Sequence, residues 1–130
     1  MSLTVPPGLL ARAEAGPVDD DAFLECVATS LPFAWSVVQS VMAGLHASGR
    51  PDHAIDADPP SDAERGQLLR FMASDAMRGA AERRYGVRLA FQNCHKVGAF
   101  TAEGVATDAF AEFVSPRGQL LNQSPELLNC

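Results

Sequence analysis

Residues 87–100, VRLAFQNCHKVGAF, are the stretch in which the apolar pattern of the chain changes its period. From 87 to 91 every second residue is large and apolar, which is typical of a β-strand. Polar side chains follow, and a second apolar run then ends at Phe100. A turn at or near Asn93-Cys94 would fold the stretch into an antiparallel hairpin. The alternative is one strand that continues through Cys94 and turns at Gly98.

Helical patterns fill most of the chain before this stretch. Residues 19–29 begin with three aspartates, and acidic side chains favour a helix N-terminus. Residues 33–47 are apolar around most of a helical circumference, so we expect this helix to be the buried packing centre. Pro32 stands between the two segments, either at the start of a second helix or as a kink in one long helix.

A third long helix is expected over residues 61–85. Ser61 and Glu64 have the Ser-x-x-Glu spacing of a capping box, and Gly86 is a suitable helix stop. After the hairpin, residues 107–113 predict a short helix that ends before Pro116.

The length of 130 residues suits one domain. The sequence therefore predicts a single α+β domain over 1–130, mostly helical, with a small antiparallel β-hairpin near 87–100. Residues 1–18 are expected to form an N-terminal arm with a short helix, and residues 49–60, GRPDHAIDADPP, a mobile acidic Pro-rich loop. Because no third strand is evident, we expect helices or a second copy of the chain to cover the hairpin edges.

The charge of the chain argues against nucleic acid as a partner. The net charge is −6, and an acidic surface repels phosphate. Four arginines could form a basic patch, but on one helix they also suit the negative end of its dipole: Arg78, Arg83, Arg84 and Arg88.

The chain is also expected to be cytoplasmic and not to bind membranes. Its N-terminus lacks a basic segment followed by a long apolar run, and no apolar run approaches the ~20 residues of a membrane span. The three cysteines, Cys26, Cys94 and Cys130, are odd in number and far apart, which makes a disulfide framework an unfavoured reading.

Two stretches, RGQLLRFMASDAMRGAAERRYGVRLAFQNCHKVGAF and SPRGQLLNQSPELLNC, resemble a family of small actinobacterial proteins of about this length. The resemblance covers nearly the whole chain, including FQNCH and the C-terminal cysteine. It implies a compact cytoplasmic protein, and it assigns no activity, cofactor or catalytic residue.

The reactive candidates are Cys94 and His95, because a thiol becomes a nucleophile when a neighbouring base favours the thiolate. Amide side chains beside them could donate hydrogen bonds to an oxyanion or to a bound ligand. The polar face of the C-terminal segment could line a pocket over the hairpin. The candidate ligand-binding residues are Gln92, Asn93, Arg117, Gln119 and Asn122. No histidines and cysteines stand at the spacing of a zinc site, so we expect no metal and no cofactor.

Two classes of function follow from these observations. The first is a small interaction or regulatory module without complete catalytic machinery, with a possible homodimer through the hairpin edge or through hydrophobic helices and an unknown protein partner. The second is a small enzyme or small-molecule-binding protein with a polar pocket around residues 92–95, in which Cys94 is the candidate nucleophile. The sequence favours the first class slightly, because no catalytic constellation in it is complete.

Overall fold

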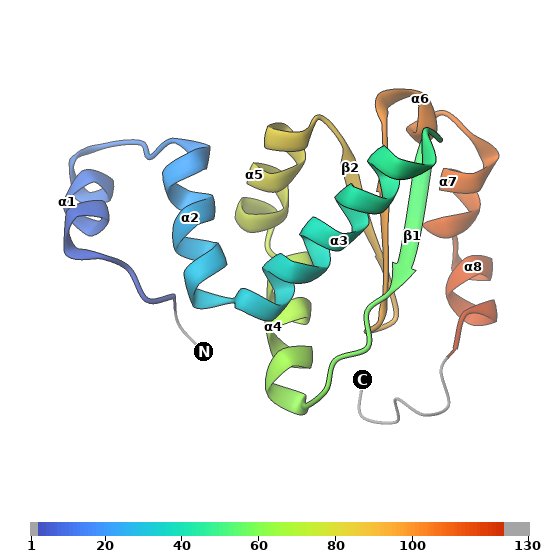
Figure 1. The fold of residues 1–130 in the computed structure, drawn as a ribbon, viewed down its shortest axis with the longest axis horizontal. Helices are drawn as coiled ribbons and strands as arrows, with labels where there is room; N and C mark the ends of the chain where they lie inside the picture. Colours follow the sequence, from blue (N-terminus) through green and yellow to red (C-terminus); the bar gives the residue numbers. More distant parts are fainter. Residues whose placement is uncertain (1–2, 124–130) are drawn as a thin grey trace.

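A three-stranded antiparallel sheet in the order β1-β3-β2 lies between two groups of helices (Figure 1). The computed structural model describes residues 3–123. The strands are β1 (Asp52–Asp56), β2 (Arg88–Gln92) and β3 (Lys96–Phe100). The expected α+β fold, mostly helical with a small antiparallel sheet, is confirmed.

The hairpin turns at residues 93–95, so the first of the two alternatives is correct. Asn93 has a φ of 52° and lies in the left-handed region, which asparagine tolerates better than most residues. The turn pairs Gln92 with Lys96 and leaves β3 with one neighbour on each side.

The expected loop at 49–60 is wrong over residues 52–56, which form β1 and pair along the whole of β3. This strand covers the β3 edge of the hairpin, which we had expected helices or a second copy to cover. His53 contacts the backbone of helix α3 (Pro32–Ser48) at Gly44, where an added Cβ would lie 2.1 Å from its Nε2 atom. The prolines and aspartates in and around this short strand are typical of a loop, and the strand forms because it pairs with a distant segment and packs on α3.

Three helices pack on one face of the sheet: α3, α4 (Asp62–Ala73) and α5 (Asp75–Tyr85). The expectation that α3 is the packing centre is confirmed, since six of its apolar residues are buried. Leu89, Val97 and Ala99 point from the sheet into the same core. Phe71 of α4 is fully buried and packs edge-on against Trp35 of α3.

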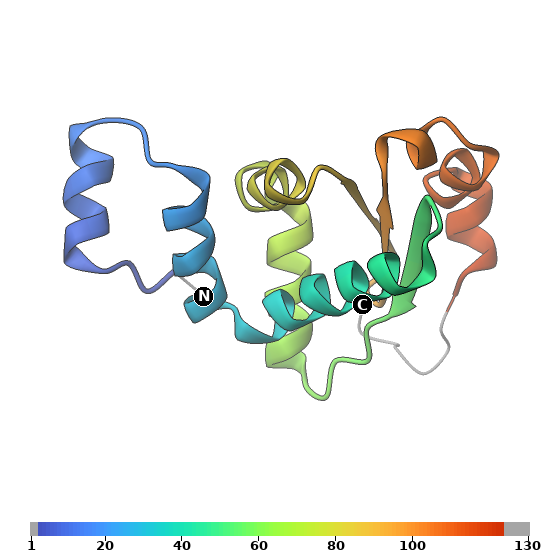
Figure 2. The same cartoon turned by 45° about the horizontal axis from the view of Figure 1, so that its top comes forward.

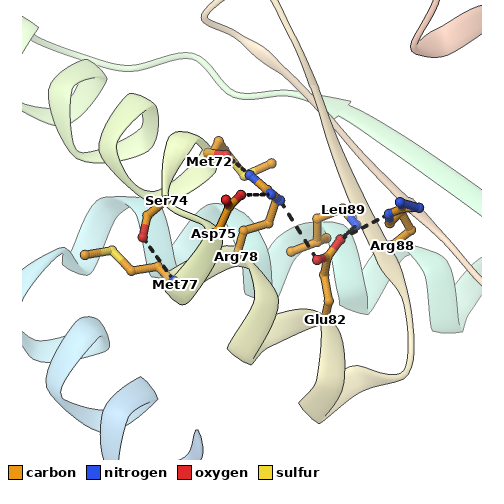
Figure 3. A network of polar contacts seen from close by, with 8 residues as sticks. All are labelled: Met72, Ser74, Asp75, Met77, Arg78, Glu82, Arg88 and Leu89. Carbon is orange, nitrogen blue, oxygen red and sulfur yellow. Dashed lines mark hydrogen bonds and ion pairs between the residues drawn. The ribbon is translucent and has the colours of Figure 1, made fainter.

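The expected helix over residues 61–85 is wrong at Ser74, where it divides into α4 and α5. Ser74 has an extended backbone, and its Oγ accepts a hydrogen bond of 3.1 Å from the backbone N–H of Met77 (Figure 3). This is an N-cap, which serine favours over the helix interior. In the sequence, Ser74-Asp75 is a typical helix N-terminus, but it lies within a longer helical pattern of apolar residues.

Helix α2 (Asp20–Ser30) ends at Leu31, and it meets α3 at a bend of 118°. Pro32 therefore separates two helices rather than kinking one. The arm contains helix α1 (Pro7–Ala15), which begins at the expected proline and lies outside α2 (Figure 2). Among the described residues no single helix is long and apolar enough to cross a membrane, although α2 and α3 taken together pass by length and composition.

Ion pairs join α2 to α5, and they use two of the four arginines that could have formed a basic patch. Arg83 contacts Asp20 at 2.8 Å, and Arg84 contacts Asp21. The hydrogen bond from Arg83 lowers the pKa of Asp20 below its ordinary value of 3.8.

The opposite face of the sheet is covered by α6 (Ala102–Val105), α7 (Asp108–Phe113) and α8 (Pro116–Leu121) (Figures 1 and 2). Phe100 of β3 lies edge-on to Phe110 and Phe113 of α7, at ring-centre distances of 4.9 and 5.5 Å. Gly98 leaves room for these rings, because an added Cβ would lie 3.1 Å from the Phe113 ring.

The two serine caps give a matched test of the helix break. Ser74→Ala removes a part-buried bond to a backbone N–H and should cost about 1 kcal/mol of unfolding free energy. Ser61→Ala should cost less, because Ser61 makes no backbone cap bond and donates instead to the Glu64 carboxylate in a solvent-exposed contact. Urea unfolding followed by circular dichroism measures both. An equal or larger loss for Ser61→Ala would contradict the two-helix arrangement.

Candidate functional site

Gln92, one of the expected ligand-binding residues, lies at the end of β2 and is only 5% exposed. Its Nε2 donates to the backbone carbonyl of Phe113 at 2.7 Å, and its Oε1 accepts from Asn122 Nδ2 at 2.5 Å. Gly118 of α8 lies against the same amide, where an added Cβ would come within 3.2 Å of Nε2. Gln92 therefore binds the C-terminal segment to the sheet.

Asn93 makes a second set of contacts with α8 and the residues after it. Its backbone N–H donates to Gln119 Oε1 at 3.3 Å, and its Oδ1 accepts from the side-chain amides of Gln119 and Gln123. Four of the five expected residues are thus brought together, but they hydrogen-bond to one another. The fifth, Arg117, stands apart: its side chain is 72% exposed and pairs with Glu112.

The expected nucleophile and base lie in the turn beside these amides. Cys94 is 2% exposed and disulfide-bonded, although the cysteine count had not favoured a disulfide. His95 is also buried, with Nε2 3.9 Å from Asp56 Oδ1 of β1 and a buried Nδ1 that has no hydrogen-bond partner among residues 3–123. Cys130 lies outside the described residues. Within residues 3–123 no three histidine, cysteine or acidic side chains gather as a metal site would require.

The edge of β2 carries backbone groups that point away from the sheet. The bonds from Ala57 N–H to His95 and from Thr101 N–H to Pro51 show that odd-numbered residues of β3 bond to β1. The even-numbered residues of β3 therefore bond to β2, and the backbone groups of Leu89 and Phe91 face outward. The Leu89 N–H confirms this, because it donates to Glu82 Oε2 at 2.8 Å.

A hollow of about 470 Å³ lies along this edge, between the α4–α5 junction and α7. A second hollow of about 420 Å³ continues between α5 and α6, and Arg88 lines both. We call the two hollows together the edge groove. Two walls enclose the first hollow. Met72 of α4 and Arg78 of α5 form one wall, and Phe110 of α7 and Val114, which follows α7, form the other.

A charge-balanced network lies beside this groove (Figure 3). Arg78 donates to Asp75 and to the Met72 carbonyl, both at 2.6 Å, and lies 3.9 Å from Glu82. Arg88 is 3.8 Å from the same glutamate, and its guanidinium lies over the Phe110 ring at 5.9 Å. Two arginines thus face two carboxylates.

Sequence reasoning missed the edge groove. It depends on which edge of the hairpin stays open and on α7 lying across from α5, and neither is a local property. The available signal was the alternation at Leu89 and Phe91, which shows a strand but not the direction in which its backbone groups point.

Residues 1–130 match a family model labelled KH_NucS_shadow, whose description reads NucS shadow ORF. The chain belongs to the NucS shadow ORF family. No curated protein and no solved structure matches it. The description of the NucS shadow ORF family names an open reading frame and attaches no activity to it.

The letters KH are also the name of a nucleic-acid module that clamps four nucleotides with a Gly-x-x-Gly loop. This member of the NucS shadow ORF family has ten glycines, and no two of them stand three residues apart. The short junction between α4 and α5 is Ser74, beside Ala73 and Asp75. The chain therefore lacks the loop with which that module holds a nucleotide backbone.

The amide contacts predict a difference between two neighbouring variants. Asn122→Ala leaves the buried Oε1 of Gln92 without its donor and should cost about 1–3 kcal/mol of unfolding free energy. Arg117→Ala removes only an exposed ion pair and should cost much less. Chemical unfolding of the two variants measures the difference. Equal losses would show that the amide contact does not hold the C-terminal segment on the sheet.

Proposed function

We propose that this chain is a non-catalytic interaction module and that the edge groove is its binding surface. The observation that carries the proposal is the open edge of β2, where the Phe91 N–H and C=O and the Leu89 C=O point outward. Open strand edges between apolar walls are the surfaces that proteins use to bind extended segments. Phe110 and Val114 supply such a wall.

The candidate catalytic and binding side chains make contacts within the protein itself, which favours an interaction module over an enzyme. The amides of Gln92 and Asn93 bond to the C-terminal segment, and the expected pocket around residues 92–95 is occupied by these contacts. Cys94 is buried and disulfide-bonded, whereas a nucleophilic thiol must be reachable and ionised. An enzymatic role for Cys94 would therefore require that its disulfide is reduced and that the turn at residues 93–95 opens.

A nucleic-acid ligand is the second candidate, favoured by the KH label of the family. Two observations speak against it. The chain has no Gly-x-x-Gly loop, and the arginines at the groove are balanced by Asp75 and Glu82 in a chain of net charge −6. We therefore propose a protein partner for the edge groove, and we retain as proposals the cytoplasmic location and a homodimer through the hydrophobic helices.

Affinity capture from cells tests the binding surface. The chain is tagged at its own locus, so recovery of the tagged chain also shows that the reading frame is translated. Val114→Asp places a charge on the groove wall, at a residue that is 54% exposed, and should remove the partner. Leu120→Asp is the matched control, since Leu120 is 73% exposed and does not line the groove. A partner that is lost equally with both variants would contradict the assignment.

Alkylation of the native protein tests the enzyme alternative. Cys94 should resist iodoacetamide, and after reduction it should label only as fast as the protein opens. His95→Ala should leave this rate unchanged once any change in stability is allowed for. Mass spectrometry of each cysteine peptide gives the rates, with the buried Cys26 as an internal reference. Rapid labelling of reduced Cys94 that slows on changing His95 would make the protein an enzyme candidate.

A further inference from the structure

Along the edge groove, β2 has outward-pointing backbone N–H and C=O groups, and only some of them are hydrogen-bonded within residues 3–123. The remaining groups determine what kind of ligand can bind there. Glu82 accepts from the Leu89 N–H. The outward groups of Phe91 and the Leu89 carbonyl bond to no residue that the structure describes. Added strands bind through such groups, because their own N–H and C=O groups alternate at the same spacing.

The walls of the groove distinguish a single segment from a second copy of the chain. The β2 edge lies in a hollow between Met72 and Arg78 on one side and Phe110 and Val114 on the other. A second copy would have to bring the same walls along with its own β2 edge, and these would compete for the space in the hollow. An isolated extended segment has no such walls and can enter.

Side chains on one face of β2 determine which segment fits. Arg88 and Ala90 point toward α7, together with Phe110. A residue opposite Ala90 would meet little bulk from β2 and could reach Phe110 and Val114, which favours an apolar side chain. A residue opposite Arg88 would meet a guanidinium that is 55% exposed, which favours a carboxylate.

We propose that the partner of the edge groove is an extended protein segment that adds to β2 as a fourth strand, with an acidic residue and an apolar residue two positions apart. This inference rests on the proposed function and names its partner class. The acidic residue pairs with Arg88, and the apolar residue packs over Ala90 against Phe110. An antiparallel segment has the apolar residue first, and a parallel segment has the acidic residue first.

Displayed peptides of random sequence, long enough to span β2, are the probe. Selection on the full chain should enrich the acidic and apolar pair. Nuclear magnetic resonance with hydrogen exchange then locates a selected peptide on the isotope-labelled chain. The amide proton of Phe91 should exchange quickly in the free chain and become protected on binding, whereas that of Ala90, which bonds to β3, should be protected in both states.

Charge reversal gives the matched control for the acidic residue. Arg88→Glu should weaken a selected peptide about ten-fold, and a peptide with lysine in place of its acid should recover affinity for that variant. The recovery keeps the test valid if Arg88→Glu alters stability. Arg117→Glu reverses an exposed arginine outside the groove and should leave binding unchanged.

Several results would overturn the inference. One is binding of the selected peptides without protection of the Phe91 amide, and another is an Arg117→Glu variant that weakens them as much as Arg88→Glu does. Salt-sensitive binding of labelled single-stranded DNA that competes with the peptides would assign the groove to nucleic acid. Light scattering that shows a dimer abolished by Val114→Asp would assign it to a second copy. If cellular capture still depends on Val114 while no peptide protects Phe91, the proposed function stands and only this inference fails.

Discussion

The rest of the structure depends on the pairing of β3 with a neighbour on each side. Its two faces carry different side chains, because alternate residues of a strand point in opposite directions. Val97 and Ala99 enter the core formed with α3, α4 and α5, while Gly98 and Phe100 meet α7. The same parity decides which backbone groups of β2 remain unpaired, so the register of the central strand determines both the core and the open edge.

Glu82 links this open edge to the helices. Its carboxylate accepts from the Leu89 N–H and lies within 4 Å of both Arg78 and Arg88, so one side chain caps a strand and balances two cations (Figure 3). The result is an edge with backbone groups available but little net positive charge. Such a surface suits the directional hydrogen bonds of a peptide strand better than the phosphates of a nucleic acid, which require an excess of positive charge.

The residues that appeared most reactive in the sequence have a structural role in the fold. Gln92 and Asn93 fix the C-terminal segment against the turn through amide hydrogen bonds, and those of Gln92 satisfy a side-chain amide that would otherwise be buried without partners. The same hydrogen bonds hold α7 across from α5, and α7 then forms the second wall of the edge groove. The expected site and the proposed site are therefore neighbours, and the first helps to build the second.

Local patterns in the sequence were sufficient for much of this protein. The alternation at residues 87–91 showed a strand, the apolar circumference of residues 33–47 showed the packing centre, and Pro7 marked the start of α1. Each of these depends on neighbours within a few residues, where side-chain period and backbone preference act directly.

Tertiary structure alone decided β1, the helix break at Ser74 and the edge groove. The acidic segment 52–56 becomes a strand because β3 offers it a ladder of hydrogen bonds between residues that lie 40 to 48 positions apart in the chain. Ser74 caps α5 rather than continuing α4 because both helices must cover one core. The edge groove exists because the third strand pairs with β3 and leaves β2 open. The free energy of each feature comes from contacts between distant segments, which no local pattern in the sequence records.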